Sequence, residues 1–90
     1  MGYNAVTVTG SATQIVAANP MRKEVNILNY SDVMIVYIGP DSSVTVQTGF
    51  PVYANQNFSN KINISEHWKG PIYGILAGGT SSVRYWEVTQ

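Results

Sequence analysis

Residues 72–89 read IYGILAGGTSSVRYWEVT, and this stretch indicates the fold class. Two runs rich in β-branched and aromatic residues, 72–77 and 82–89, flank Gly78-Gly79. Such residues favour strands, and glycines readily adopt the positive φ that tight hairpin turns require. The stretch therefore predicts a β-hairpin. Alternation gives its last strand two faces, one with Val83, Tyr85 and Glu87 and the other with Arg84, Trp86 and Val88.

Upstream of this hairpin, turn residues divide the chain into short segments of the same kind. The predicted strands are residues 4–9, 13–17, 23–30, 33–38, 43–48 and 57–65. In the third of them, Val25 and Ile27 share one face. Residues 49–53 are expected at a sheet edge, because Pro51 cannot donate to a ladder. Seven to nine short antiparallel strands in one domain, residues 1–90, are typical of a small β-sandwich or a jelly-roll-like barrel.

The composition supports an all-β class. Valine and isoleucine number 19 against two leucines, whereas helical proteins rely on Leu, Ala, Glu and Lys. Only 11% of the residues are charged, compared with about 25% in average soluble domains. The formal net charge is zero, so the chain has no basic excess to neutralise a phosphate backbone. We therefore expect no nucleic-acid partner.

The same arithmetic indicates self-association. The 90 residues contain no cysteine and one histidine, so neither a disulfide nor a zinc site is expected to stabilise this small core. The remaining means of shielding its apolar strands is a partner subunit. The longest apolar run, residues 33–38, is far shorter than the ~20 residues that span a bilayer. Residues 1–4 lack the features of a signal peptide, so we expect synthesis in a host cytoplasm and no membrane.

Chemistry-bearing residues form no pattern of a catalytic or metal site. His67 stands beside Ser65 and Glu66, but neighbours in a loop rarely adopt the geometry of a catalytic triad. Asp32 and Asp41 occur in turn signatures, where capping explains them. The five carboxylates are scattered singly, and no glycine pattern fits a phosphate. We therefore expect no enzyme activity, no catalytic residue, no metal and no cofactor.

The aromatic residues, 11% of the chain, allow three interpretations. They fill the core, or they anchor a contact with another subunit or a capsid, where Tyr and Trp are enriched. Alternatively, two or three exposed coplanar rings form a platform on which a sugar stacks. Trp68 and Tyr53, in loop or edge positions, are the best candidates for exposed rings. Trp86, on the last strand, is expected in the core or an interface.

The chain also resembles the small all-β virion proteins of tailed bacteriophages, of the capsid decoration (cement) or head-fibre-base type. The resemblance rests on "V-x-I-x-N" at residues 25–29, "V-Y-I-G" at 36–39, "G-x-P-V" at 49–52 and "Y-x-I-x-A-G-G-T-x-x-V-R-x-x-E" at 73–87. Residues 53–56 depart from it, since such proteins more often have Pro-Leu and a glycine there. The resemblance implies a structural protein, often a trimer, that sits on a capsid and has no active site.

These observations predict a homo-oligomer, with a trimer favoured, that decorates and stabilises the exterior of a phage capsid by binding the major capsid protein. Its location would be the virion. The alternative is a receptor- or carbohydrate-binding tip of a head or tail fibre. Arg84 and Glu87 are expected at a subunit edge or as a surface pair. The candidate interface residues are Val33, Met34, Ile35, Val36, Tyr37, Tyr53, Trp68, Arg84 and Trp86.

Overall fold

The protein is an all-β structure of eight strands. The computed structural model describes residues 2–31, 34–54, 60–65 and 67–89. The strands are β1 (Gly2–Val8), β2 (Thr13–Val16), β3 (Arg22–Asn29), β4 (Val36–Gly39), β5 (Phe50–Val52), β6 (Lys61–Ser65), β7 (Ile72–Ile75) and β8 (Ser81–Thr89). The described residues contain no helix long and apolar enough to cross a membrane.

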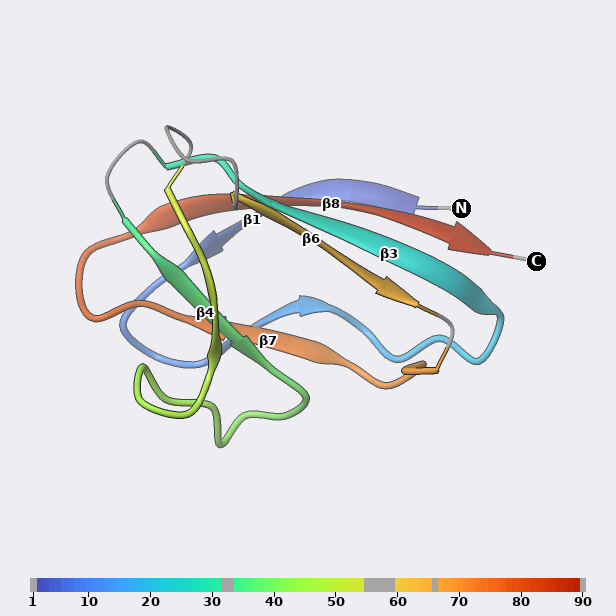
Figure 1. Cartoon of the computed structure of the whole chain (residues 1–90), viewed down its shortest axis with the longest axis horizontal. Helices are drawn as coiled ribbons and strands as arrows, with labels where there is room; N and C mark the ends of the chain where they lie inside the picture. The colour runs from blue at the N-terminus through green and yellow to red at the C-terminus, as the bar shows by residue number, and fades with distance from the viewer. Residues whose placement is uncertain (1, 32–33, 55–59, 66, 90) are drawn as a thin grey trace.

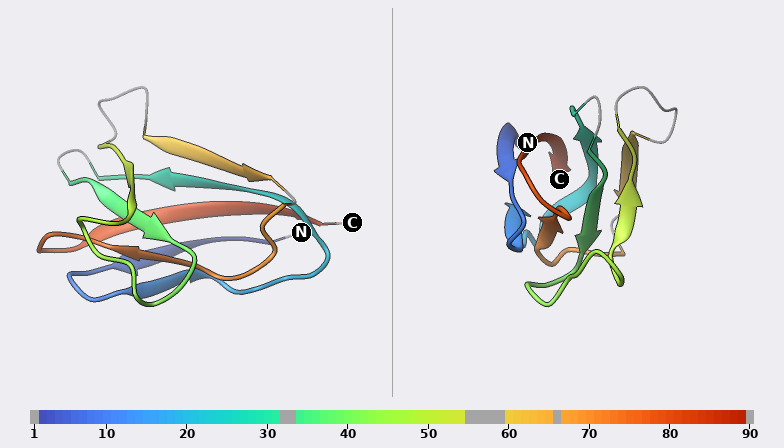
Figure 2. Two further views of the ribbon diagram at one scale, coloured as in Figure 1. Left: turned by 60° about the horizontal axis from the view of Figure 1, so that its bottom comes forward. Right: turned by 90° about the vertical axis from the view of Figure 1, so that its left-hand side faces the viewer.

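The strands form two antiparallel four-stranded sheets that face each other (Figures 1 and 2). Sheet A has the order β1-β8-β3-β6, and sheet B has the order β2-β7-β4-β5. The described strands do not close into a barrel, so of the two architectures that the sequence predicted, the fold is the small β-sandwich. Strand β5 lies at the edge of sheet B, which confirms the prediction from Pro51.

The core lies between the sheets and consists almost entirely of β-branched side chains. Strand β3 shows how the sequence produces it: Val25 and Ile27 are buried while Asn26 is exposed, the alternation of a strand with one wet face. The fully or nearly fully buried residues of this core are Val8, Ile15, Val16, Val25, Ile27, Val36, Ile38, Val52, Ile72, Leu76 and Val83.

A buried ion pair between β3 and β8 lies at the start of β3, beside two of the loops that connect the sheets. The Arg22 guanidinium is fully buried, and its Nε donates to Glu87 Oε2 over 2.7 Å. Its remaining nitrogens donate to the carbonyls of Ala17, Trp68 and Gly70 at 2.7, 3.2 and 2.9 Å. Four hydrogen bonds compensate the desolvation of the charge, so this group fixes two loops against β8.

A buried amide has the same role at the other end of β3. Asn29 Nδ2 donates to the carbonyls of Met34, Val52 and Tyr53, and Asn29 Oδ1 accepts from Ser81 Oγ. These bonds connect β3 in sheet A with the ends of β4 and β5 in sheet B. Both ends of β3 are thus held by polar side chains, in place of the disulfide that the chain lacks.

The hairpin predicted for residues 72–89 is wrong. Strands β7 and β8 belong to different sheets, and residues 76–80 carry the chain from sheet B to sheet A (Figure 1). Each side of β8 is occupied along its length, by β1 and by β3. The pairing of β8 with two long strands therefore determines the fold here, and the local preference of Gly78-Gly79 for a hairpin turn does not. Gly79 still has a positive φ of 77°, so the glycine is needed for the crossing.

The predicted strand 43–48 is also wrong, because local hydrogen bonds satisfy this backbone. Asp41 Oδ1 accepts from the Ser43 amide, and the Thr45 carbonyl accepts from Gly49 N at 2.8 Å. The Thr45 amide donates to Thr48 Oγ1. Asp and Thr side chains compete with ladder hydrogen bonds in this way, and the segment forms turns. Of its valines, Val44 is buried and adds to the core.

The strand predicted for residues 33–38 begins later, at Val36. Met34 and Ile35 precede β4; the Met34 amide donates to Ser31 Oγ, and its carbonyl accepts from Asn29, so neither group joins a ladder. In β4 itself, Val36 and Ile38 face the core. Val33 lies outside the described residues, as do residues 57–59 of the predicted strand 57–65.

Candidate binding surfaces

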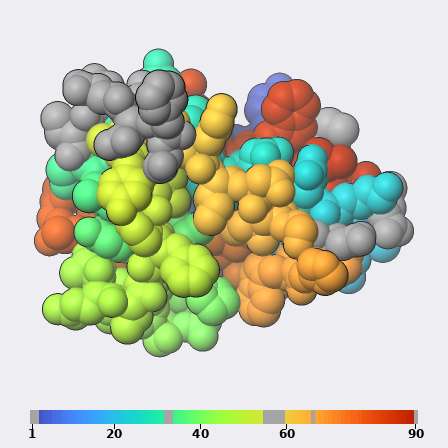
Figure 3. All heavy atoms as spheres, in the orientation of Figure 1, coloured from blue at the N-terminus to red at the C-terminus, as the bar shows by residue number. Residues whose placement is uncertain are grey.

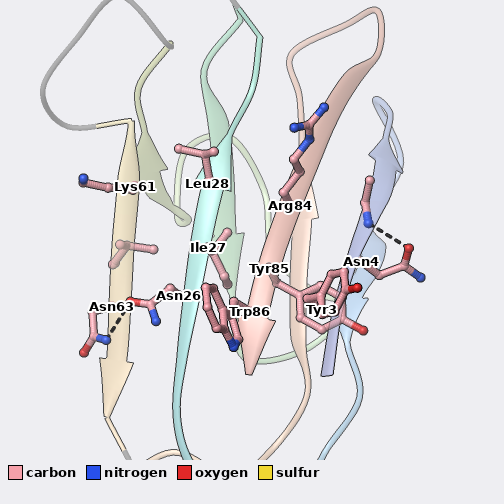
Figure 4. Close-up of a pocket in the computed structure, with 12 residues that line it drawn as sticks. Tyr3, Asn4, Asn26, Ile27, Leu28, Lys61, Asn63, Arg84, Tyr85 and Trp86 are labelled. Carbon is pink, nitrogen blue, oxygen red and sulfur yellow. Dashed lines mark hydrogen bonds between the residues drawn. The ribbon is translucent and has the colours of Figure 1, made fainter. Parts of the chain in front are cut away.

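The outer face of sheet A carries a row of side chains that crosses all four strands. The register places Tyr3 opposite Trp86, Trp86 opposite Asn26, and Asn26 opposite Asn63. Directly paired residues share a face and stand about 5 Å apart, so the row runs from two aromatic rings to two amides. Tyr3 is 81% exposed and Trp86 is 57% exposed. Figure 4 shows Trp86 toward β3 and Tyr3 between β8 and β1.

The two amides of this row form a fixed network. Asn63 Nδ2 donates to Asn26 Oδ1 over 2.8 Å and to Glu24 Oε2 over 3.1 Å. Within the described part of the chain, Asn63 Oδ1 and Asn26 Nδ2 make no further intramolecular hydrogen bond. One acceptor and one donor therefore point to solvent from an orientation that the network holds.

A second row, parallel to the first, consists of Ala5, Arg84, Leu28 and Lys61. The Arg84 guanidinium lies 3.8 Å from the centre of the Tyr30 ring, a cation–π contact worth about 0.5–1 kcal/mol at an exposed site. The two rows together line a shallow depression of about 910 Å³ (Figure 4).

A second surface, the open side of the sandwich, is an apolar groove between β6 of sheet A and β4 and β5 of sheet B. Figure 3 shows β5 and β6 next to each other on one face of the molecule. The groove has a volume of about 500 Å³, and its apolar lining residues are Ile38, Phe50, Ile62, Ile64, Trp68 and Ile72. Phe50, on its rim, is 69% exposed. Here the core continues to the surface without a covering layer.

Trp68 is positioned at this groove by its own loop. Its indole Nε1 donates to the Pro71 carbonyl over 3.0 Å. A side chain at position 70 would lie 2.5 Å from Cζ2 of the ring, so Gly70 is required for the ring to lie over the backbone. The ring is 39% exposed and presents its remaining surface to the groove and solvent.

The structure distributes the candidate interface residues over different surroundings. Val36 is fully buried in the core and has no surface for a partner, and Met34, Ile35 and Tyr37 are half-buried. Val33 lies outside the described residues. The exposed candidates are Tyr53, Trp68, Arg84 and Trp86. Arg84 and Trp86 lie on the outer face of sheet A, and Trp68 lines the groove.

Two expectations for individual residues need correction. Arg84 and Glu87 do not form a pair, because they occupy opposite faces of β8: Glu87 points inward to Arg22, while Arg84 points outward over Tyr30. Trp86 is 57% exposed, so of the two places expected for it, the core and an interface, the core is excluded. In both cases, the period-2 alternation of β8 decides the outcome.

His67 and the carboxylates form no cluster among the described residues. His67 is exposed, and its backbone amide donates to Ser65 Oγ over 3.4 Å. Asp41 caps its turn, and hydrogen bonds from the Ser43 side chain and backbone lower its pKa below the ordinary value of 3.8. No group of three His, Cys, Asp or Glu in the described ranges could hold a metal. Asp32 and Glu66 lie outside those ranges.

The sequence did not indicate most of the residues that form these two surfaces. Tyr3, Asn26 and Asn63 are adjacent only because β1, β8, β3 and β6 pair in that order, and alternation within single strands does not reveal strand order. Phe50 and the isoleucines of β6 likewise meet across two sheets. Alternation alone did place Asn26 away from Val25 and Ile27, and Trp86 away from Val83.

Comparison with known proteins gives no relative from which a role could be transferred: no family model, curated protein or solved structure matches the chain.

Proposed function

We propose that the protein is a structural component of a bacteriophage virion that forms a homo-oligomer, a trimer, and decorates and stabilises the outside of the capsid. The observation that supports self-association most directly is the groove beside Phe50. Its lining is almost wholly apolar, in a chain with few charges to keep monomers apart. Covering a large apolar side chain contributes about 1.5–3 kcal/mol, so Phe50 and Trp68 both favour burial by a second copy.

Two unpaired strand edges border this groove. Among the described strands, β6 pairs with β3 alone, and β5 pairs with β4 alone. Exposed edges beside an apolar surface are a template for association unless something covers them. In a trimer, each subunit's groove meets a different part of the next subunit, since a three-fold ring uses heterologous contacts. Such a ring would shield the grooves of all three subunits.

The capsid as the partner is supported by the sequence resemblance to decoration and head-fibre-base proteins. A protein that binds only the assembled shell stabilises the shell by mass action, and the effect adds over many identical sites. This role requires no active site. The carbohydrate-binding alternative has its own structural support on the outer face of sheet A, in the row from Tyr3 to Asn63, which shares only Asn63 with the groove.

The experiment is size-exclusion chromatography with light scattering on the parent protein and on Phe50→Ser. We expect a trimer for the parent at micromolar concentration and a folded monomer for Phe50→Ser. The matched control is Tyr3→Ser, which removes a still more exposed ring outside the groove and should remain trimeric. A parent protein that is monomeric under these conditions would refute the assembly role.

The capsid part of the proposal is tested separately by cosedimentation with shells assembled from the major capsid protein of the same phage. The parent should pellet in saturable amounts, and the shells should withstand a higher temperature once decorated. A trimer that does not bind the shells would leave the groove as a subunit contact but would refute the decoration role.

A further inference from the structure

We propose that the outer face of sheet A is a saccharide-binding site, in which sugar rings stack on Trp86 and Tyr3 while sugar hydroxyls bind Asn26 and Asn63. This surface meets the Phe50 groove only at Ile62 and Asn63, which line both, and the inference does not depend on a role in the capsid.

The aromatic half of the row fits the apolar face of a sugar ring. Tyr3 and Trp86 are directly opposite each other in neighbouring strands, and both remain mostly exposed. Aromatic rings are amphipathic surfaces that bind C–H groups with their faces, and each has a polar atom at its edge. In Figure 4 the two rings stand on either side of β8, so consecutive units of one chain can contact both.

The two amides of the row supply the polar contacts, and the length of the row matches that of a short oligosaccharide. Neighbouring strands lie about 4.8 Å apart, so the four-residue row extends over about 14 Å, the length of a short oligosaccharide. A sugar hydroxyl is both donor and acceptor. Asn63 Oδ1 can accept from it and Asn26 Nδ2 can donate to it. Because the bonds to Asn26 and Glu24 already hold the Asn63 amide, little side-chain entropy is lost when the ligand binds.

The charged residues of this face favour a hydroxylated ligand over a protein. The depression is lined mostly by apolar surface, but Lys61 and Arg84 are among its lining residues, whereas the cores of protein interfaces are depleted of charged residues. The described lining residues of the groove beside Phe50 include none that is charged. This difference in charge supports a sugar at the outer face of sheet A and a protein contact at the groove. Lys61 and Arg84 would also attract a sugar that carries a carboxylate.

The test is an NMR titration of the parent protein with three probes: the N-acetylglucosamine trimer, maltotriose and the galacturonic acid trimer. We expect saturable shifts with at least one probe, at a dissociation constant on the order of 1 mM or below. The shifts should include the Trp86 indole N–H and the side-chain amides of Asn26 and Asn63, whereas the Trp68 indole should not move. A response to the galacturonic acid trimer alone would identify an acidic sugar.

Variants decide whether the row itself binds. Trp86→Ala and Asn63→Ala should each weaken binding at least about tenfold, a difference of about 1.4 kcal/mol. Phe50→Ala removes a ring of comparable exposure from the groove and should bind like the parent. The proposal is overturned by the absence of saturable shifts with all three probes, by binding that persists in Trp86→Ala, or by an oligomer in which Trp86 is buried.

Discussion

Replacing Arg22 by methionine should destabilise the fold more than any single change at the surface. The guanidinium is fully buried and makes four hydrogen bonds. In the Arg22→Met variant, Glu87, whose side chain is 11% exposed, would retain only the bond from Asn19 Nδ2 at 3.2 Å. Removing one partner of a buried ion pair typically costs about 3–5 kcal/mol.

That loss is large for a chain of this size. At about 0.05–0.15 kcal/mol per residue, a domain of 90 residues has a free energy of unfolding of about 5–13 kcal/mol. The variant should therefore lose about a quarter or more of its free energy of unfolding. Its Tm should fall by more than about 10 °C, since 1 kcal/mol shifts the Tm of such a domain by about 4–8 °C.

Urea unfolding followed by circular dichroism measures the effect, with Glu87→Gln and the double variant Arg22→Met/Glu87→Gln completing a cycle. Glu87→Gln retains an acceptor oxygen for Arg22 and should cost less than Arg22→Met. The double variant should recover the stability that Arg22→Met loses by leaving the Glu87 carboxylate unpaired. It should not recover the stability lost with the hydrogen bonds to the carbonyls of Ala17, Trp68 and Gly70. A loss below about 1 kcal/mol in Arg22→Met would refute the role given to this cluster.

Two further predictions concern the turns. Gly79→Ala should cost about 1–2 kcal/mol of stability because position 79 has a φ of 77°; Gly78→Ala, where an added methyl group meets nothing within 4 Å, should be close to neutral, and equal losses would contradict this account. The pKa of Asp41, measured by NMR titration, should lie below 3.8 and should rise in Ser43→Ala. Because the folded-state pKa is lowered, the turn's stabilisation is present above the unfolded value and is lost as the pH falls through the folded one; an unchanged pKa in Ser43→Ala would rule out the hydrogen bonds as the cause.

The features that the sequence predicted correctly are those that depend on neighbouring residues. Period-2 alternation gave the all-β class and the buried faces of β3, and Pro51 predicted an edge position. The failures required knowledge of distant partners. Gly78-Gly79 looked like a hairpin turn, but β8 pairs with β1 and β3 instead. Likewise, the alternation of Val44 and Val46 resembled a strand until hydrogen bonds within the turn supplied the alternative.

Strand β6 explains how so small a domain can present two chemically different surfaces. Its side chains alternate: Ile62 and Ile64 line the groove, while Lys61 and Asn63 stand in the two rows on the outer face of sheet A. A shift of one residue in the pairing with β3 would exchange these sets and place isoleucines among the amides. The bonds from Asn63 to Asn26 and Glu24 therefore favour the register that keeps the apolar groove and the polar face apart. Apart from Ile62 and Asn63, which line both hollows, the two surfaces share no lining residue, so a contact that covers the groove does not in itself cover Trp86.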